Sequence, residues 1–250
     1  MTDRPLAAVV MAAGRGTRMK DPTKAKVMYD LNGMPLIHYV ADLAYELKTS
    51  RVIVIVGHQR DVVIDFLRRE HPDVETAVQD QQLGTGHAVL QAEKALAPFE
   101  GDVVVLSGDV PLLTAESMRE LIRHHRSTRA VGTILTAKLN DPTGYGRVLR
   151  NPDGSVRRIV EHKDATEEER RIDEINSGIY VFDCRRLYEA LHHLTPANAQ
   201  GEYYLTDVFE DFWKHHQTVS ALLASHPDEI RGINTPDQLE EARIALLSRG

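Results

Sequence analysis

The residue types of one early loop suit an anionic ligand. Residues 9–20 read VVMAAGRGTRMK, so small residues and glycines are followed by the cations Arg15, Arg18 and Lys20. Glycine lets the backbone approach a ligand, exposed N–H groups favour an anion, and the cations suit a polyphosphate. The string lacks the G-x-x-x-x-G-K-[ST] pattern of a Walker A loop, and Met19 stands where a dinucleotide fingerprint has its third glycine. A strand-to-helix turn with solvated basic residues is the alternative interpretation.

A second string, QDQQLGTGHAV at residues 79–89, also follows a predicted strand. Gln79 and Gln82 carry amides that can read the edge of a base through paired donors and acceptors. The glycines around Thr85 then turn into a helix. The alternative is a plain loop between a strand and a helix, with Thr85 as the helix cap.

A third string, VVVLSGDVPL at residues 103–112, brings Asp109 to the end of a buried strand. A carboxylate there suits Mg²⁺, which binds to one or two carboxylates together with phosphate oxygens. The alternative is an aspartate that caps the next helix, although Thr114 is better placed for that. Ligands of open α/β sheets bind beyond the carboxyl ends of the strands, so these three strings are expected to meet.

Shorter polar strings occur further along the chain, and each alone would be read as a loop or a cap. They are PTGYGR at 142–147, VEHKDA at 160–165, EINSGIY at 174–180, AQGEYYLTD at 199–207 and GIN at 232–234. Among them, Glu161 and Asn176 are predicted at strand ends, where they could bind hydroxyl groups.

Strands and helices alternate in the first half of the chain. Predicted strands cover residues 7–11, 52–56, 75–78 and 103–106, and predicted helices cover 36–47, 61–69, 86–96 and 115–125. The strands are continuously apolar, which predicts an α/β fold with a parallel sheet covered by helices on both faces.

The pattern changes after Val131 to strands joined by turns. Strands are predicted at 133–139, 146–150, 156–161, 179–182 and 219–223, with a hairpin turn at NPDG, 151–154, and helices at 185–193 and 204–215. The last helix is expected to begin at Thr235-Pro236, with threonine as its cap.

Composition narrows the class of protein. The chain has 250 residues, of which 42% are apolar, and a net charge of −7. This charge argues against nucleic acid as the main partner, and no apolar stretch reaches the roughly 20 residues of a membrane span. Cys184 is the only cysteine, and the first strand begins too near Met1 for a signal peptide, so we expect a cytoplasmic protein.

The histidine doublets at 124–125, 192–193 and 215–216 are interpreted as surface residues near helix ends and not as zinc ligands.

Taken together, the motifs resemble a known family. They occur in the order MAAGRGTRM, LGTGHAV, GDVPLL, DPTGYGRV, IVEHKDA, EINSGIYVF and NAQGEYYLTD. This set is similar to the sugar nucleotidyltransferases, and within them to the N-terminal pyrophosphorylase domain of bacterial N-acetylglucosamine-1-phosphate uridyltransferases. The resemblance extends from Ala7 to about Asn234 and does not include the C-terminal β-helix of the bifunctional family, which acetylates glucosamine 1-phosphate.

The resemblance implies a Rossmann-like nucleotidyltransferase fold with a mixed, mostly parallel sheet and a small β-rich sugar-binding insertion. It implies a single domain over 1–250, with a nucleotide-binding part at about 1–130, a sugar-binding part at about 131–235 and a C-terminal helix at about 235–249. It implies transfer of UMP from UTP to N-acetylglucosamine 1-phosphate with Mg²⁺ as cofactor, and it indicates no particular oligomeric state.

The resemblance also implies a role for each motif. Residues expected to hold the nucleotide are Ala12, Ala13, Gly14, Gly16, Gln79, Gln82, Gly84 and Thr85. Residues expected to hold the sugar are Gly108, Gly146, Glu161 and Asn176. Arg18 and Lys26 would face the triphosphate as catalytic residues, and Asp109 and Asn234 would bind Mg²⁺.

One departure from the family concerns the sugar. Ser107 stands where the family usually has a tyrosine, which leaves the choice of sugar open. The alternatives are a nucleotidyltransferase for another sugar phosphate or base, such as glucose 1-phosphate or dTTP, and a non-catalytic module that binds a nucleotide sugar. A sugar transferase of related fold would usually carry an Asp-x-Asp motif, which is missing from the strand end.

Overall fold

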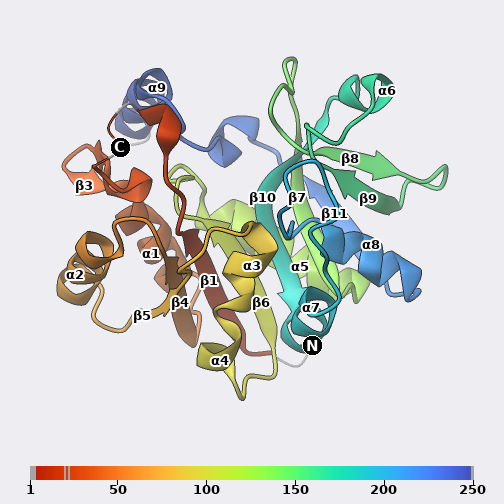
Figure 1. The fold of residues 1–250 in the computed structure, drawn as a ribbon, viewed down its shortest axis with the longest axis horizontal. Coiled ribbons are helices and arrows are strands. Elements are labelled where there is room, and N and C mark those ends of the chain that lie inside the picture. Colours follow the sequence, from red (N-terminus) through yellow and green to blue (C-terminus); the bar gives the residue numbers. More distant parts are fainter. Residues whose placement is uncertain (1–3, 20, 22, 249–250) are drawn as a thin grey trace.

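The centre of the molecule is a nine-stranded mixed sheet. The computed structural model describes residues 4–19, 21 and 23–248, and the strand order in its main sheet is β11-β7-β10-β6-β1-β4-β5 (Figure 1). The bounds of these strands are β1 Leu6–Ala12, β4 Arg51–Val56, β5 Glu75–Val78, β6 Asp102–Ser107, β7 Gly132–Lys138, β10 Glu174–Asp183 and β11 Val219–Leu223. β1 is parallel to β4 and β6, β4 is parallel to β5, and β7 is parallel to β11. β10 alone in this order runs antiparallel to both neighbours.

Helices cover both faces of this sheet because the side chains of each strand alternate between two apolar cores. Along β1, Ala8 and Val10 belong to one core, whereas Ala7 and Val9 belong to the other. The first core is closed by α1 (Leu36–Glu46), α2 (Arg60–Glu70) and α5 (Ala115–Thr128). The second is closed by α3 (Thr85–Leu90), α4 (Glu93–Leu96), α7 (Cys184–Leu191) and α8 (Asp207–Lys214). This is the predicted α/β architecture with a mostly parallel sheet.

A small β-rich unit extends the sheet beside β10. It consists of β8 (Arg147–Arg150), β9 (Val156–Val160) and the short helix α6 (Glu167–Arg170). β8 and β9 form an antiparallel hairpin around the predicted NPDG turn, and β8 pairs with β10 at Arg147 and Ile175. The insertion is therefore attached to the strand that lies next to β6.

A third, smaller apolar cluster joins the end of the chain to its beginning. α9 (Pro236–Leu247) starts at Pro236 with Thr235 as its cap, as predicted, and Gln238 completes a capping box with Thr235. Ile233 and Ala242 pack in one cluster with Met19. The remaining short elements are η1 (Thr17–Met19), η2 (Lys26–Met28), β2 (Asp30–Leu31), β3 (Met34–Pro35) and η3 (Pro227–Ile230). The chain thus returns after β11 to the glycine-rich loop that follows β1.

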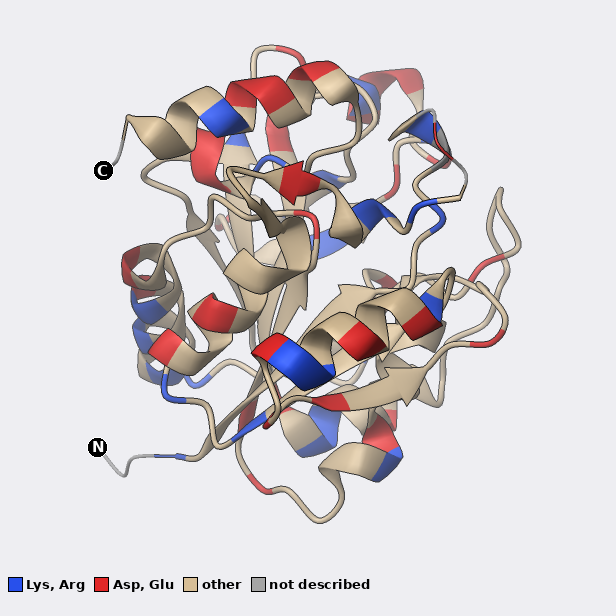
Figure 2. Cartoon of the chain, turned by 90° about the vertical axis from the view of Figure 1, so that its left-hand side faces the viewer, with Lys and Arg blue, Asp and Glu red and all other residues tan. Residues whose placement is uncertain are grey.

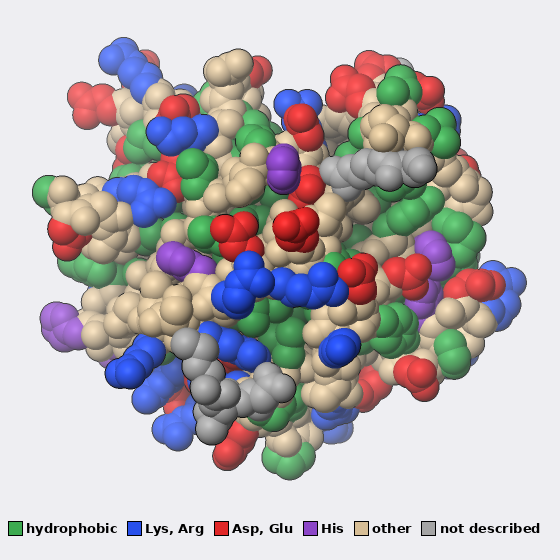
Figure 3. All heavy atoms as spheres, turned by 180° about the vertical axis from the view of Figure 1, so that it is seen from behind, with side chains coloured by type: hydrophobic (Ala, Val, Ile, Leu, Met, Phe, Trp, Pro, Cys, Tyr) green, Lys and Arg blue, Asp and Glu red, His purple; other side chains and the backbone are tan. Residues whose placement is uncertain are grey.

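Charged residues lie mainly on the helices and loops, as Figure 2 shows for α9 near the C-terminal label. On the face in Figure 3, acidic, basic and histidine side chains lie side by side. Within the part of the chain that the structure describes, no helix has both the length and the apolar character that crossing a bilayer requires.

Two predicted elements need correction. The predicted helix at 86–96 is divided into α3 and α4, because the Gln91 side chain donates to the His87 carbonyl at 2.9 Å and the Gln91 N–H turns to the Ala88 carbonyl. The predicted strand at 179–182 begins earlier, at Glu174, so Asn176 lies inside β10 and not at a strand end. The register of β10 with β7 shifts between Asn176 and Tyr180, which lets the polar N-S-G sequence continue the strand.

The interpretation of all the histidine doublets as surface residues is wrong for His125. This side chain is 2% exposed, and its Nδ1 lies 2.8 Å from the Thr133 hydroxyl. Its Nε2 lies 3.8 Å from the buried carboxylate of Asp102, which Arg4 and Arg126 also contact. Burial lowers the pKa of His125 from 6.5 to about 4, and the Asp102 charge opposes this shift only in part.

We predict that this histidine makes the protein less stable in mild acid. The unfolded chain takes up a proton near pH 6.5, whereas folded His125 stays neutral down to about pH 4. The free energy of unfolding should therefore fall by up to about 1.4 kcal/mol per pH unit across this window. Denaturant titrations should show a flatter pH dependence for His125→Gln, while the exposed-site variant His215→Gln keeps the wild-type slope. Equal slopes in all three proteins would contradict this assignment.

Candidate functional site

A cavity of about 290 Å³ opens at the carboxyl ends of β1, β5 and β6. It is lined by Met11, Ala12, Ala13, Gly14, Lys26, Val27, Gln79, Gln82, Gly84, Thr85, Ala88, Ser107, Asp109 and Glu202. The three strings that the sequence places at strand ends therefore meet around one space.

The amide of Gln79 is held in a fixed orientation on one wall of this cavity. Gln79 is 3% exposed, and its Nε2 donates to the Gly84 carbonyl at 3.0 Å and lies 3.1 Å from His87 Nδ1. Both amide hydrogens are thus used inside the protein. The Oε1 oxygen is left as the atom that Gln79 can offer to a ligand carrying an N–H donor.

The glycines on this side of the cavity are needed for close approach. Gly84 has φ +110°, and a Cβ there would lie 2.5 Å from the Tyr203 carbonyl oxygen. Tyr203 N–H donates to the Leu83 carbonyl, and Gly86 N–H donates to the Tyr203 carbonyl, each at 2.8 Å. These bonds fasten the loop before α3 to the segment before α8.

A charged cluster also borders the cavity. Lys26 Nζ donates to Asp109 Oδ2 and, at 2.8 Å, to Asn234 Oδ1. The Arg18 guanidinium donates to the same Asn234 oxygen at 2.7 Å. Lys26 and Asp109 are 13% and 22% exposed, so the cluster is partly shielded from water.

Backbone contacts hold this cluster together although its members are far apart in the sequence. Ile233 N–H donates to the Asp109 carbonyl at 2.8 Å, which sets Asn234 beside Asp109. Gly16 lies against Lys26, since a Cβ at this glycine would come 2.7 Å from the lysine Cβ. Gly108 N–H donates to the Met11 carbonyl at 2.9 Å and so ties the end of β6 to β1.

The Asp109 and Asn234 oxygens fit a divalent cation. A carboxylate and an amide oxygen are hard ligands of the kind that Mg²⁺ binds. Both point at one cation already, the Lys26 ammonium, so this ammonium occupies the kind of position that a metal ion requires. Gly232 leaves room there, with its Cβ position 3.3 Å from Asp109 Oδ2.

A second group of predicted residues gathers between β8, β9 and β10. Asn176 Oδ1 accepts from the Gly178 N–H and from the Tyr180 hydroxyl, both at 2.9 Å. These two bonds occupy Oδ1, so the Nδ2 group is the donor that the Asn176 side chain can offer. A Cβ at Gly146 would lie 3.4 Å from both Asn176 Cβ and the Glu161 carboxylate, so Gly146, Glu161 and Asn176 are neighbours.

Glu161 is the titratable residue of this second group. One carboxylate oxygen accepts from the Thr206 hydroxyl at 3.1 Å. Burial raises the pKa of Glu161, the Thr206 hydrogen bond opposes this shift, and Asp164 and Glu202 add to it. Ser107 connects the two groups, because it lines the cavity and its hydroxyl donates to the Gly178 carbonyl at 3.3 Å.

The structure thus sorts the sequence-predicted residues into connected sets. The cavity gathers Ala12, Ala13, Gly14, Gln79, Gln82, Gly84, Thr85, Lys26 and Asp109. Asn234 adjoins the cavity through its contact with Lys26, and Arg18 adjoins it through Asn234. Gly16 lies against Lys26, and Gly108 ties the end of β6 to β1. Gly146, Glu161 and Asn176 form the second group. Lys20 lies outside the described residues.

Sequence reasoning missed Glu202 and Tyr180. Glu202 lines the cavity, and its string AQGEYYLTD was noted without a role for this residue. Tyr180 orients Asn176, and the signal was a tyrosine four residues after a polar strand residue.

A mixed α/β sheet with a glycine-rich loop, fixed amides and a cluster of cations and oxygens at its carboxyl edge defines a nucleotide-binding enzyme fold of the Rossmann-like type. The chain belongs to the nucleotidyl transferase family, whose model matches residues 7–227.

Individual relatives agree with this assignment. The chain is 45% identical over 242 residues to the bifunctional protein GlmU of Halalkalibacterium halodurans. The aligned region covers 97% of this chain and 52% of the relative. It is 47% identical over 244 residues to the same-named protein of Acetivibrio thermocellus, covering 98% and 52%. The chain therefore spans about half the length of these curated relatives. A crystal structure of UDP-glucose pyrophosphorylase with UDP-glucose shares the fold, with a TM-score of 0.77, 18% identity, and 98% and 100% of the two chains covered.

We predict that Gly84→Ala destabilises the protein more than Gly144→Ala. Both glycines have positive φ, so each substitution should cost about 1–2 kcal/mol through backbone strain. Only Gly84 faces atoms closer than 3 Å, whereas a Cβ at Gly144 meets nothing within 4 Å. Denaturant unfolding should therefore show a further loss of about 1–3 kcal/mol for Gly84→Ala. Equal losses would mean that the contact with Tyr203 relaxes without cost.

Proposed function

We propose that the protein transfers UMP from UTP to N-acetylglucosamine 1-phosphate, producing UDP-N-acetylglucosamine and pyrophosphate. The single observation that carries this proposal is the convergence of the Gln79 amide, the glycine loops and the Lys26–Asp109–Asn234 cluster on one cavity. The similarity to bifunctional GlmU proteins over nearly the whole chain supports it. The lone, free Cys184 fits the cytoplasm, which we propose as the place of the reaction.

On the nucleotide side, the oriented Gln79 supports uracil recognition. The Oε1 oxygen of Gln79 would accept from the N3–H of uracil, because both hydrogens of its amide are held by the protein. Backbone N–H groups around Gly14 would approach the triphosphate, which the missing side chain of glycine permits.

On the phosphate side, the residues align charges and do not need to remove a proton. A phosphate oxygen of the sugar phosphate attacks the α-phosphorus of UTP, the bond from this phosphorus to the bridging oxygen breaks, and pyrophosphate leaves with the electron pair. The nucleophile is already ionised, so no general base is required. Arg18 and Lys26 neutralise phosphate charge. Asp109 and Asn234 would hold Mg²⁺, which supplies further charge neutralisation when bound.

On the sugar side, Asn176 and Glu161 supply a donor and an acceptor. The Nδ2 group of Asn176 would donate to a sugar hydroxyl or to the N-acetyl carbonyl. Glu161 would accept from a hydroxyl, since Thr206 fills only one of its oxygens. Ser107, which is smaller than the tyrosine usual in the family, would leave space near the sugar.

We predict Mg²⁺-dependent pyrophosphate release that is fastest with UTP and N-acetylglucosamine 1-phosphate. The measurement is a screen of four nucleoside triphosphates and dTTP against this sugar phosphate, glucose 1-phosphate and glucosamine 1-phosphate. Asp109→Ala should lower turnover at least about a hundredfold, because a metal clamp on transferring phosphates contributes several kcal/mol. Circular dichroism should show that this variant is folded.

Three results would count against the proposal. Absence of release with every pair would refute catalysis, and a preference for glucose 1-phosphate would refute the N-acetyl assignment. Near-normal turnover of folded Asp109→Ala would remove Asp109 from the metal site.

We predict that Tyr180 acts as a positioning residue through Asn176. Tyr180→Phe should raise the KM for the sugar phosphate about fivefold, as loss of one hydrogen bond of about 1 kcal/mol predicts, and leave the KM for UTP unchanged. The matched control is Tyr188→Phe, a buried tyrosine whose hydroxyl donates to the Val89 carbonyl at 3.4 Å and does not contact Asn176. A similar rise in both KM values, or the same effect of Tyr188→Phe, would indicate a general packing defect.

A further inference from the structure

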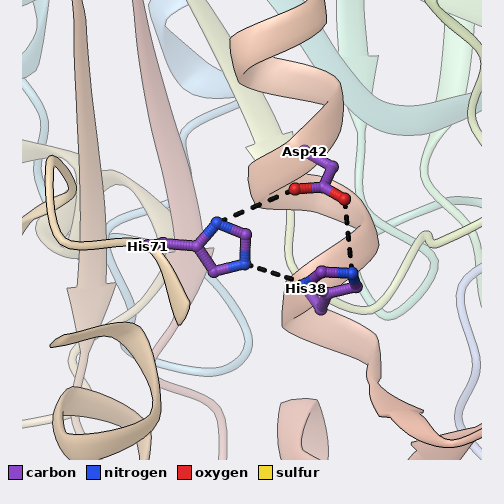
Figure 4. A group of neighbouring side chains, drawn as sticks. All are labelled: His38, Asp42 and His71. Atoms are coloured by element: carbon purple, nitrogen blue, oxygen red, sulfur yellow. Dashed lines mark hydrogen bonds and ion pairs between the residues drawn. The ribbon is translucent and has the colours of Figure 1, made fainter. Parts of the chain in front are cut away.

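Two histidines and an aspartate form a compact cluster outside the site described above. His38 and Asp42 lie one turn apart on α1, and His71 directly follows α2 (Figure 4). His38 Nδ1 lies 3.0 Å from His71 Nε2, and His38 Nε2 lies 3.3 Å from Asp42 Oδ2. His71 Nδ1 lies 3.8 Å from Asp42 Oδ1. The three side chains therefore close a triangle in which every corner contacts the other two.

The triangle leaves one lone pair without a proton. Two neutral rings carry one proton each, which suffices for the two shorter contacts, at 3.0 Å and 3.3 Å. The third contact, at 3.8 Å, is longer than a hydrogen bond, so His71 Nδ1 then faces a carboxylate oxygen with its lone pair. A cation that binds both atoms would make this contact favourable.

The surroundings of His71 are mainly apolar. The His71 side chain is 3% exposed and is stacked on Tyr45, with Phe66 at 6.1 Å between ring centroids. The Tyr45 hydroxyl has no hydrogen-bond partner among the described residues, so it does not satisfy the ring nitrogens either.

We infer that His38, Asp42 and His71 form a binding site for a divalent transition-metal ion such as Zn²⁺. One nitrogen of each imidazole and one carboxylate oxygen all lie within 4.8 Å of one another. Tetrahedral zinc with bonds of about 2.0–2.1 Å separates its ligand atoms by ~3.3 Å, so these three ligand atoms would have to move closer together around an ion. His38 and Asp42 are 22% and 58% exposed, so small rotations of these two side chains can close the site.

The donor set separates this site from the one at Asp109. Two imidazoles and one carboxylate suit Zn²⁺, whereas Mg²⁺ binds oxygen ligands and keeps its water. Three protein ligands leave a fourth position, which the exposed side of Asp42 opens to water. The ion would fasten the first turns of α1 to the end of α2 and so stabilise the folded protein by mass action.

The test is calorimetric titration of the metal-free full chain with Zn²⁺ in excess Mg²⁺, which occupies oxygen-only sites. Wild type should bind one Zn²⁺ per chain through this site. His38→Gln and Asp42→Asn should weaken the binding at least about tenfold, because each removes a ligand. His192→Gln is the matched control, since this exposed histidine also pairs with a carboxylate, Glu93 at 2.9 Å, and should bind like wild type.

Thermal unfolding gives a second measurement on the same proteins. Zn²⁺ should raise the Tm of wild type and of His192→Gln, and should raise it less in His38→Gln and Asp42→Asn. The inference is overturned if wild type binds no Zn²⁺, or if both cluster variants bind it as tightly as wild type. Neither measurement involves nucleotide or sugar, so this result is independent of the proposed reaction.

Discussion

The site depends on the pairing of Lys26 with Asp109 and Asn234. Lys26 and Asp109 are largely withdrawn from water, and a shielded charge without a partner is expensive, so the three side chains must stay together. They come from the segment after β1, the end of β6 and the segment before α9. β1 and β6 are parallel neighbours, so their carboxyl ends meet at one edge of the sheet. The segment that contains Ile233 brings Asn234 to Asp109 and so completes the charged cluster. Ile233 also packs in the third apolar cluster, which holds this segment in place.

The elements that the sequence predicts well are those whose apolar pattern is continuous. The strands β1, β4 and β6 follow directly from such runs. The failures occur where side-chain hydrogen bonds replace backbone ones. Gln91 breaks the predicted helix by bonding to the His87 carbonyl. Asn176 continues a strand that its own type disfavours, because the irregular register beside Tyr180 accommodates it.

Site residues could be predicted only as members of motifs, since a motif fixes residue types but not distances. Strand ends located Gln79 and Asp109, the cationic loop located Arg18, and the resemblance added the metal-binding role of Asn234. His125 was wrongly predicted at the surface because both histidines of the doublet received the same interpretation. Adjacent residues of a helix face different directions, so a helix can bury one of the two. The triangle around His71 gave no sequence signal, because 33 positions separate His38 from His71 and only the packing of α1 against α2 brings them together.

The direction of β10 has a consequence for how the family can diversify. Because β10 runs opposite to β6, its first residues, near Asn176, reach the edge where β6 ends, and its last residues, near Phe182, fill the core. The proposed sugar contact of Asn176 and the aromatic anchor Phe182 therefore lie in different halves of one strand. Ile175 and Ile179 in the first half are also buried in the core, so they cannot vary freely. Under the proposed function, a change of substrate would act on the polar positions between them and not on the strand as a whole.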